Sequence, residues 1–582
     1  MPFPKAFGGR AQPTNSTSDS IEVSNQQDTI EADKEANVPD QDAQPGIQKI
    51  EAVTLVWTKW SLALLLINIW IIFLTNGLRL SILASLTPYV TSAFQSHSLI
   101  TVIGIVANAM TAAVYIPMAK LLDVWGRAEG FLLAVGCATL GVVLMAVSDG
   151  LATFCAARVF YSIGFAGIIY TVAVLAADVT SLRNRGLAFA FTSSPYMITA
   201  FAGPKAAEGF LENVNWRWGF GAFAIIVPAM TLPLFVLLKV QLRKAEREGR
   251  FVREKSGRSV MQSLRYGLVA FDLPGVFIFA AGLTLFLLPF TLAASAPSGW
   301  RTPYIIAMII VGFILLILFA LYEKYLASHP FIANTFLTDR TVIACCLIDA
   351  TYQVSYYCWN SYFTSFLQVV SNLSVAEAGY VNSTFQVVSG VLLFIVGYAI
   401  RRTQRFRWVF YIAVPLYIFG LGLMIHFRQP NQYIGYIIMC EIFISMGGSV
   451  FILLVQLGVL AAVDHQHVAA VLASLYVSGT VGGAIGNTIS GAIWTNTFLG
   501  ALQRNLPELA VGNATLIYAD LTTQLSYPVG SAERIAIQES YGYAQTRMLA
   551  AGVGVMALCF VWVLMLRNLD LSKKGQTKGM VF

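Results

Sequence analysis

Lys120-Leu121-Leu122-Asp123-Val124-Trp125-Gly126-Arg127 is a short polar turn between two long apolar runs. Gly126 permits a tight reversal of the chain, and Asp123 and Arg127 place opposite charges where two helices are expected to end. We predict that these two side chains pair and hold the helix ends together. Such a pair can act as a gate if it breaks in a second conformation; a plain turn rich in positive charge is the alternative.

Apolar runs like the two beside this turn recur along the chain. Of the 582 residues, 57% are hydrophobic and 12% are charged, whereas about a quarter of a soluble domain is charged. A helix that crosses a bilayer needs about 20 mostly apolar residues. We therefore predict an all-α polytopic membrane protein with about 14 transmembrane helices, near 60–82, 98–120, 130–148, 152–176, 187–206, 218–239, 273–292, 303–323, 342–367, 377–400, 408–426, 433–460, 467–494 and 548–566.

Basic residues mark one side of this predicted bundle. They are concentrated in alternate connections, above all in 243–258, and are sparse in the others. Because cytoplasmic connections of membrane proteins carry an excess of Lys and Arg, we expect both termini in the cytoplasm. This distribution explains the net charge of +7, and no nucleic-acid partner is expected.

The predicted outer side has one long connection, 495–547, which contains Tyr541 and Tyr543. Asn372 and Asn513 also fall on that side and begin N-x-Ser/Thr sequences, so both are predicted glycosylation sites. The 7 cysteines and 5 histidines form no cluster with metal-ligand spacing, and no catalytic constellation stands out. We expect neither a metal site nor enzymatic activity.

Two stretches far apart in the chain resemble each other. Val174 to Asp178 leads into Arg185 and a new apolar run, and Val459 to Asp464 leads into another. Repeated halves with a substrate site between them are typical of transporters. The repeat therefore points to a carrier with two related halves.

The turn at 119–127 resembles the signature G-x-L-x-D-x-x-G-R of the major facilitator superfamily, with Ala119 near the position of the first glycine. This resemblance favours the gate over the plain turn. The predicted cytoplasmic gate comprises Asp123, Gly126, Arg127, Asp178 and Arg185.

Arg158 resembles the second motif of that superfamily, although Tyr161 and Ser162 replace its usual Gln-Gly, and Gly203-Pro204 is similar to a reduced antiporter motif. The resemblance implies the major facilitator fold, with two six-helix halves and two extra helices. The implied segments are a disordered cytoplasmic tail (1–55), an N-terminal half (56–240), a basic cytoplasmic loop (241–271), two extra helices (272–325), a C-terminal half (340–566) with the extracellular loop 495–547, and a cytoplasmic tail (567–582).

Several further stretches resemble the fungal siderophore–iron transporters of the fourteen-span branch, among them 89–94, 215–220, 271–275, 352–370 and 541–545. This resemblance implies proton symport of ferric siderophores across the plasma membrane, with endosomal vesicles as a second location. It also implies a monomer without a cofactor, because the iron is carried inside the siderophore. A proton-coupled exporter of drugs or toxins and a transporter-like nutrient sensor are the alternatives.

Charged residues inside predicted spans are costly, so they are functional candidates. Asp349 and Glu441 lie deep in their spans, and a buried carboxylate can carry a proton. We predict that they couple transport to protons, with Arg158 as a charge partner. A static ion pair between two helices is the alternative for each.

The predicted span 342–367 is rich in aromatic and amide side chains. Such a wall suits a bulky ligand that needs ring contacts and a few polar groups, and the family resemblance favours this role over interfacial packing. The predicted substrate-binding residues are Tyr352, Gln353, Tyr356, Trp359, Asn360 and Phe363.

Overall fold

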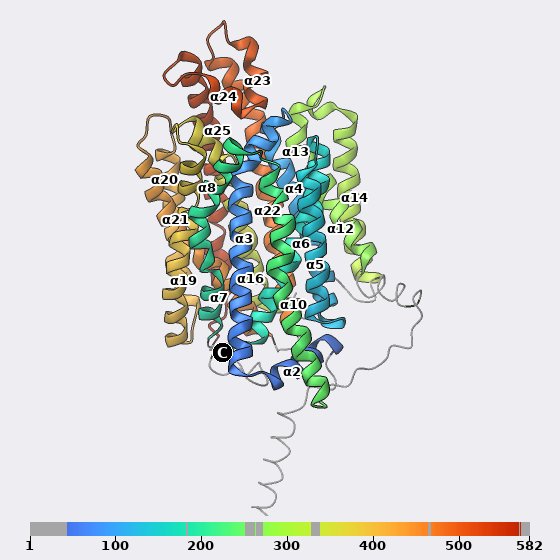
Figure 1. Cartoon of the computed structure of the whole chain (residues 1–582). Coiled ribbons are helices and arrows are strands. Elements are labelled where there is room, and N and C mark those ends of the chain that lie inside the picture. The colour runs from blue at the N-terminus through green and yellow to red at the C-terminus, as the bar shows by residue number, and fades with distance from the viewer. Residues whose placement is uncertain are drawn as a thin grey trace, which may run out of the picture.

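The computed structural model describes residues 44–181, 184–250, 262, 272–326, 338–463, 467–569 and 571. Within these ranges every regular element is a helix, and most of the long helices run along one common axis (Figure 1). The α-helices are α2 (Pro45–Val56), α3 (Lys59–Ala93), α4 (Ile100–Val124), α5 (Arg127–Ala146), α6 (Leu151–Asp178), α7 (Arg185–Ser193), α8 (Pro195–Asn213), α9 (Trp218–Gly221), α10 (Phe223–Arg247), α12 (Leu273–Leu287), α13 (Pro289–Leu292), α14 (Pro303–Tyr325), α16 (Arg340–Asn360), α17 (Phe363–Val369), α18 (Val375–Asn382), α19 (Thr384–Thr403), α20 (Arg407–Phe427), α21 (Ile434–Ala462), α22 (Val468–Asn505), α23 (Ala514–Ala519), α24 (Leu521–Ser526), α25 (Ala532–Met556) and α26 (Cys559–Met565).

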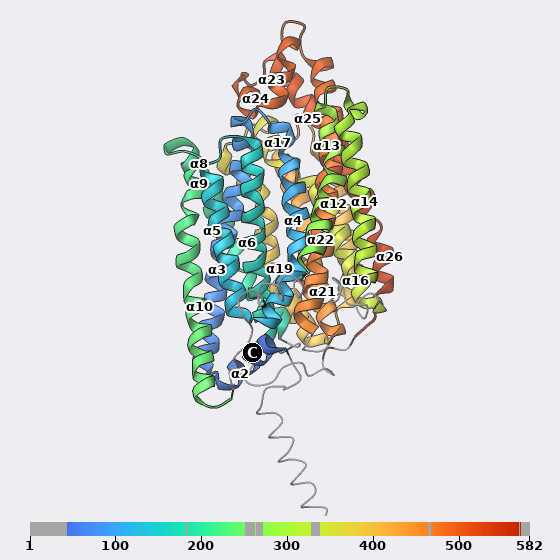
Figure 2. The same ribbon diagram turned by 90° about the vertical axis from the view of Figure 1, so that its right-hand side faces the viewer.

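The two ends of the bundle differ. α2 lies across one end, and α23 and α24 project from the other (Figures 1 and 2). We call the end with α2 the basal end and the end with α23 and α24 the apical end.

In the described part of the chain, 12 helical segments are long and apolar enough to cross a membrane. The predicted spans near 187–206 and 342–367 are helical, as α7 with α8 and α16 with α17, but they are not among those segments. Both carry more polar side chains, and each is interrupted between its two helices. The prediction of an all-α membrane protein is confirmed, whereas the count of 14 is not.

Two sets of helices face each other, an N-terminal set (59–247) and a C-terminal set (340–565). Their closest approaches pack α4 on α22 and pack α7 and α8 on α18 and α19. Glycines permit the helices of the two sets to approach this closely. A Cβ added to Gly104 would lie 2.6 Å from Asn487, and a Cβ added to Gly379 would lie 2.4 Å from Pro204. Small residues serve in this way in membrane helix pairs. Helices α12 and α14 pack on each other at the edge, with α12 against α4.

The prediction that 1–55 is disordered is wrong for its last part. Residues Pro45–Val56 form α2, whose apolar side chains Ile47, Ile50 and Val53 are buried. The helix packs on the turn after α4, where a Cβ on Gly46 would lie 2.4 Å from the Asp123 carbonyl oxygen. An apolar face with helical spacing explains the order of this segment. Residues 1–43, most of the predicted basic loop (251–261 and 263–271) and 572–582 lie outside the described residues.

The predicted extracellular loop from 495 to 547 is helical at both of its limits. Helix α22 continues to Asn505, and α25 begins at Ala532, so the connection is shorter and contains α23 and α24. Ser531 caps α25 by accepting a hydrogen bond from the Arg534 backbone N–H, as N-terminal serines commonly do. These polar and mixed turns carry too few apolar residues to be identified as helix by hydropathy.

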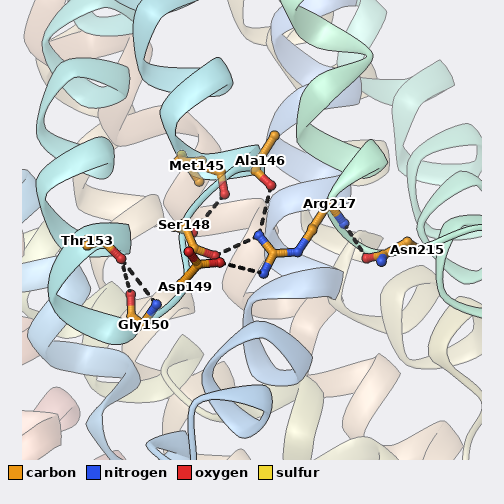
Figure 3. Close-up of polar contacts among 8 residues, drawn as sticks. All are labelled: Met145, Ala146, Ser148, Asp149, Gly150, Thr153, Asn215 and Arg217. Atoms are coloured by element: carbon orange, nitrogen blue, oxygen red, sulfur yellow. Dashed lines mark hydrogen bonds and ion pairs between the residues drawn. The ribbon is translucent and has the colours of Figure 1, made fainter.

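Arg217 ties two apical connections of the N-terminal set together, as Figure 3 shows. Its Nη1 donates to the carbonyl oxygens of Ala146 (3.0 Å) and Ser148 (2.7 Å), and its Nη2 lies 3.4 Å from Asp149 Oδ1. Asn215 Oδ1 accepts from the Arg217 backbone N–H at 2.9 Å. One guanidinium thus satisfies the carbonyls left open at the C-terminal end of α5.

The contact of α5 with α6 gives a test of the packing. A Cβ on Gly164 would lie 2.1 Å from the Ala138 backbone nitrogen, so Gly164→Ala must push the helices apart. We expect overpacking to cost about 1–3 kcal/mol and to lower the Tm of the purified protein in detergent. Gly136→Ala on α5 is the control, because its new Cβ has nothing within 4 Å. Equal Tm values for both variants would contradict this packing.

Candidate functional site

A cavity of about 670 Å³ lies between the two sets of helices, within the usual size of small-molecule pockets. Both sets contribute to its wall, and aromatic rings alternate there with hydroxyl and amide groups. The tyrosines among the described lining residues are Tyr115, Tyr170, Tyr196, Tyr352, Tyr356, Tyr357, Tyr362 and Tyr476. The amides are Gln353, Asn360, Asn382, Gln386, Gln456 and Asn487.

Four of the predicted substrate-binding residues line this cavity, namely Tyr352, Gln353, Tyr356 and Asn360. The other two, Trp359 and Phe363, are buried behind the wall. The prediction for Phe363 assumed one continuous helix, but α16 ends at Asn360. Tyr362 then takes a left-handed conformation with φ 59°, which turns α17 away.

Aromatic residues join the two sets at the apical end of the cavity. Trp494 stacks on Tyr362 with ring centroids 4.2 Å apart. Both rings bond to Ser98 of the N-terminal set: Tyr362 Oη donates to its carbonyl oxygen at 2.7 Å, and Trp494 Nε1 donates to its hydroxyl at 3.1 Å. Tyr541 supports this cluster, 5.1 Å from Trp494. The prediction that Tyr541 lies in a loop is wrong, since it is a buried residue of α25.

A second group of contacts joins the sets at the basal end. Tyr170 Oη donates to the Ala469 carbonyl oxygen at 2.5 Å. Tyr115 and Tyr476 pack on each other with centroids 5.3 Å apart, and both contact Tyr170. The cavity is therefore flanked at both ends by contacts between the N-terminal and C-terminal sets.

The predicted gate residues meet at the basal end of the N-terminal set. Arg127 Nη1 lies 2.7 Å from Asp123 Oδ1, and Arg127 Nε lies 3.2 Å from Asp178 Oδ2. Gly126 has φ 118°, which favours glycine, and it is the N-cap residue of α5, directly before Arg127. The spacing predicted the pair of Asp123 with Arg127, whereas the second carboxylate joins only through tertiary packing.

Arg185 lies beside this cluster and bonds mainly to backbone. Its Nη2 donates to the carbonyl oxygens of Ala177 (2.8 Å) and Thr180 (3.0 Å), and the side chain is fully buried. Carbonyls at the C-terminal end of a helix are open acceptors and carry partial negative charge. Arg185 thus connects the start of α7 to the end of α6.

The two candidate proton carriers occupy different places behind the cavity wall. Asp349 on α16 packs on α22, where a Cβ on Gly479 would lie 2.1 Å from its Oδ2. Glu441 on α21 is fully buried, and neither of its oxygens has a hydrogen-bond partner within 3.5 Å among the described residues. Arg158 forms no ion pair within 4.0 Å with either acid in the described part of the chain, so its predicted role as their partner is not supported.

Arg428 is the buried arginine whose charge acts on Glu441, although the two side chains form no ion pair within 4.0 Å in the described part of the chain. It is fully buried, its Nη1 donates to the Trp359 carbonyl oxygen at 2.6 Å, and its Cζ lies 4.3 Å from the Phe363 ring centroid. In the sequence Arg428 falls in one of the predicted outer connections, where basic residues are sparse. The one signal in the sequence that could have identified Arg428 as a buried charge is its position directly after an apolar run. Many surface arginines occupy such a position, so the signal does not distinguish a buried arginine from an exposed one.

The remaining predicted outer residues are accessible. Asn372 and Asn513 are exposed, although Asn372 Oδ1 accepts from Arg534 Nη2 at 3.3 Å. Tyr543 is exposed on α25 and not in a loop, with Arg547 Cζ 3.5 Å from its ring centroid.

Comparison with solved structures defines the fold class. The chain is similar to a bacterial homologue of the human lysosomal transporter Spinster in an inward-facing, unoccupied conformation, with a TM-score of 0.55, 15% identity, and coverage of 88% of this chain and 98% of that one. It is also similar to the human organic anion transporter MFSD10, with a TM-score of 0.52, 12% identity, and coverage of 86% and 99%. The profile of the Major Facilitator Superfamily matches residues 69–298. The fold is that of a major facilitator.

Closer relatives define the family within this class. The siderophore iron transporter mirB of Emericella nidulans is 67% identical over 94% of this chain and 90% of its own length. The MFS siderochrome iron transporter 1 of Gibberella zeae is 64% identical, and the MFS siderochrome iron transporter B of Aspergillus fumigatus is 59% identical, each over 94% of this chain and 90% and 89% of its own length. The chain belongs to the siderophore iron transporters of the major facilitator superfamily.

The buried cluster of Arg127 with two carboxylates makes a direct prediction. Arg127→Gln leaves Asp123 and Asp178 buried without their cation, which typically costs about 3–5 kcal/mol. We expect a clear fall in the Tm of the purified protein. Lys205→Gln is the matched control, because the Lys205 side chain is 69% exposed beside Glu208, so we expect little change there. A Tm for Arg127→Gln equal to that of the control would show that the cluster does not stabilise the fold.

Proposed function

We propose that this protein imports ferric siderophores, the iron–hydroxamate chelates, across the plasma membrane. The names of its close relatives support siderophore iron as the substrate. The single observation that carries the proposal in this chain is the cavity of about 670 Å³, walled by tyrosines and amides. A ferric siderophore presents apolar edges together with carbonyl oxygens, which match ring contacts and amide or hydroxyl donors. Tyr352, Gln353, Tyr356 and Asn360 are the proposed substrate-binding residues.

Alternating access is the proposed mechanism. Contacts between the two sets flank the cavity at both ends, so opening one group of contacts while keeping the other exposes the cavity to one side. The apical group centres on Ser98, and the basal group centres on Tyr170. The buried Asp123, Arg127 and Asp178 cluster, with Arg185 and Gly126, would keep α4, α5 and α6 together as the N-terminal set moves. Packed interfaces of this kind switch between discrete arrangements.

Proton symport is the proposed energy source. Glu441 is fully buried with Arg428 as its counter-charge, and Asp349 is buried against α22. A carboxylate in such a place is stable without charge, so it can bind a proton in one access state and release it in the other. A proton moving down its gradient would then accompany each chelate.

The basal end is proposed to lie in the cytoplasm and the apical end outside the cell, with endosomal vesicles as a second location. Positive charge in the basal connections supports this orientation. The exposed Asn372 and Asn513 would then be available for glycosylation, and Tyr541 and Tyr543 would lie in the extracellular part. The protein is proposed to act as a monomer, to catalyse no chemical reaction and to need no cofactor, since the iron arrives inside its ligand.

Uptake of radiolabelled iron tests the proposed function. The full chain is produced in cells that lack their own siderophore carriers, and a panel of ferric siderophores is offered. We expect intracellular iron to rise with at least one of them, and Tyr356→Ala to reduce that uptake more than Tyr543→Ala, because only the first lines the cavity. Drug resistance without iron uptake from any siderophore would favour an exporter and contradict the proposal.

Proton coupling makes a separate prediction. Glu441→Gln keeps the size and hydrogen-bonding groups of the side chain but cannot exchange a proton. We expect its uptake to lose the stimulation by an acidic exterior that the unchanged protein shows, with the amount of protein at the membrane unaltered. Glu533→Gln in the first turn of α25 is the control. A full acid response in Glu441→Gln would remove this residue from the coupling mechanism.

A further inference from the structure

Two guanidinium groups contact one tyrosine ring beside the cavity. Arg158 Cζ lies 4.4 Å from the Tyr161 ring centroid, and Arg79 Cζ lies 4.7 Å from the same centroid. Arg79 Nη1 also donates to Tyr161 Oη, and Arg79 Cζ lies 3.7 Å over the Phe165 ring. Faces of aromatic rings attract cations, so Tyr161 holds both arginines in place despite their like charge.

Arg158 is the member of this stack that reaches the cavity. Of the described residues that line the cavity, it is the one with a formal charge at neutral pH. Its Nε and Nη1 are buried without a hydrogen-bond partner, and no described residue accepts a bond from its guanidinium. The side chain can therefore offer a ligand in the cavity its positive charge and Nη2, the guanidinium nitrogen that is not enclosed in this way.

No carboxylate lines the cavity to offset this charge, within the described part of the chain. Asp349 packs on Gly479, and Glu441 is attracted by Arg428. Arg79, behind Tyr161, adds a second positive charge on the same side as Arg158. The electrostatic character of the cavity is thus positive near Tyr161.

We propose that Arg158, positioned by Tyr161 and backed by Arg79, selects ferric chelates by charge. It binds carbonyl or carboxylate oxygens on the shell of neutral and anionic chelates, and it disfavours chelates that carry an ammonium group. This inference rests on the proposed function and specifies the class of siderophore. For a charge about 8 Å from Arg158 and an effective dielectric constant of about 20, the affinity changes by about thirtyfold.

One scaffold with three charges tests the proposal. The ferric complex of desferrioxamine B carries a free ammonium; N-acetylation of that amine makes the complex neutral, and N-succinylation makes it an anion. Binding to the purified full-length protein is followed by quenching of its tryptophan fluorescence. We expect the dissociation constant to fall from the ammonium form to the acetyl form to the succinyl form, with at least tenfold between the first and the last.

Variants show whether Arg158 causes this order. Arg158→Gln is expected to reduce the ratio of the dissociation constants of the ammonium and succinyl forms at least threefold. The charge of Arg79 remains in this variant and is expected to preserve a smaller preference for the succinyl form. Arg158→Lys keeps the charge and is expected to retain most of the order. Arg547→Gln removes an exposed arginine of α25 that does not line the cavity, and it is expected to leave the order unchanged.

The outcomes separate this proposal from the one it rests on. Equal dissociation constants for the three complexes, or tighter binding of the ammonium form to the tyrosine wall, would overturn charge selection while leaving siderophore transport intact. If none of the three binds, the same charge series built on a cyclic trihydroxamate is measured. Failure of both series to bind would overturn the proposed function and this inference with it. If Arg158→Gln does not fold, equal dissociation constants in the unchanged protein would still overturn the proposal, and Arg158→Lys still tests the residue.

Discussion

Compensation of buried charge is the constraint on which this structure depends. A charge inside a helical membrane bundle is costly unless an opposite charge or a polar group stabilises it. Arg127 meets this requirement with two carboxylates at 2.7 and 3.2 Å, and Arg185 meets it with backbone carbonyls. These contacts connect α4, α5, α6 and α7, so satisfying the charges also determines which helix ends lie together.

The region around the central cavity shows a second way in which this protein accommodates buried charge. Here charges are kept near the wall with incomplete compensation. Arg158 is held by the Tyr161 ring instead of a carboxylate, and Glu441 is buried with Arg428 as its charged neighbour. Groups stabilised in this partial way retain the capacity to bind a ligand oxygen or a proton. The helices that carry Arg158 and Glu441 also pack closely on their neighbours through glycines, Gly164 on α6 and Gly447 on α21.

The aromatic clusters give the two ends of the cavity different characters. Trp494, Tyr362 and Ser98 combine ring stacking with two hydrogen bonds at the apical end. At the basal end the tyrosines meet a single carbonyl, that of Ala469. The two ends of the cavity are thus joined by contacts of different chemistry.

The sequence by itself determined the class of fold and the pairing of Asp123 with Arg127, because both depend on local signals. Continuous apolar runs of about 20 residues cross a bilayer as helices. Asp123 and Arg127 are four residues apart, on either side of one short connection. It also identified four residues of the cavity wall. Only the tertiary structure decided that Trp359 and Phe363 lie behind that wall and that α2 packs on the turn after α4. It also decided that Arg79 and Arg158 both contact the Tyr161 ring. Those outcomes depend on a break at Tyr362 and on contacts between distant helices, and neither hydropathy nor spacing encodes which faces of two helices meet.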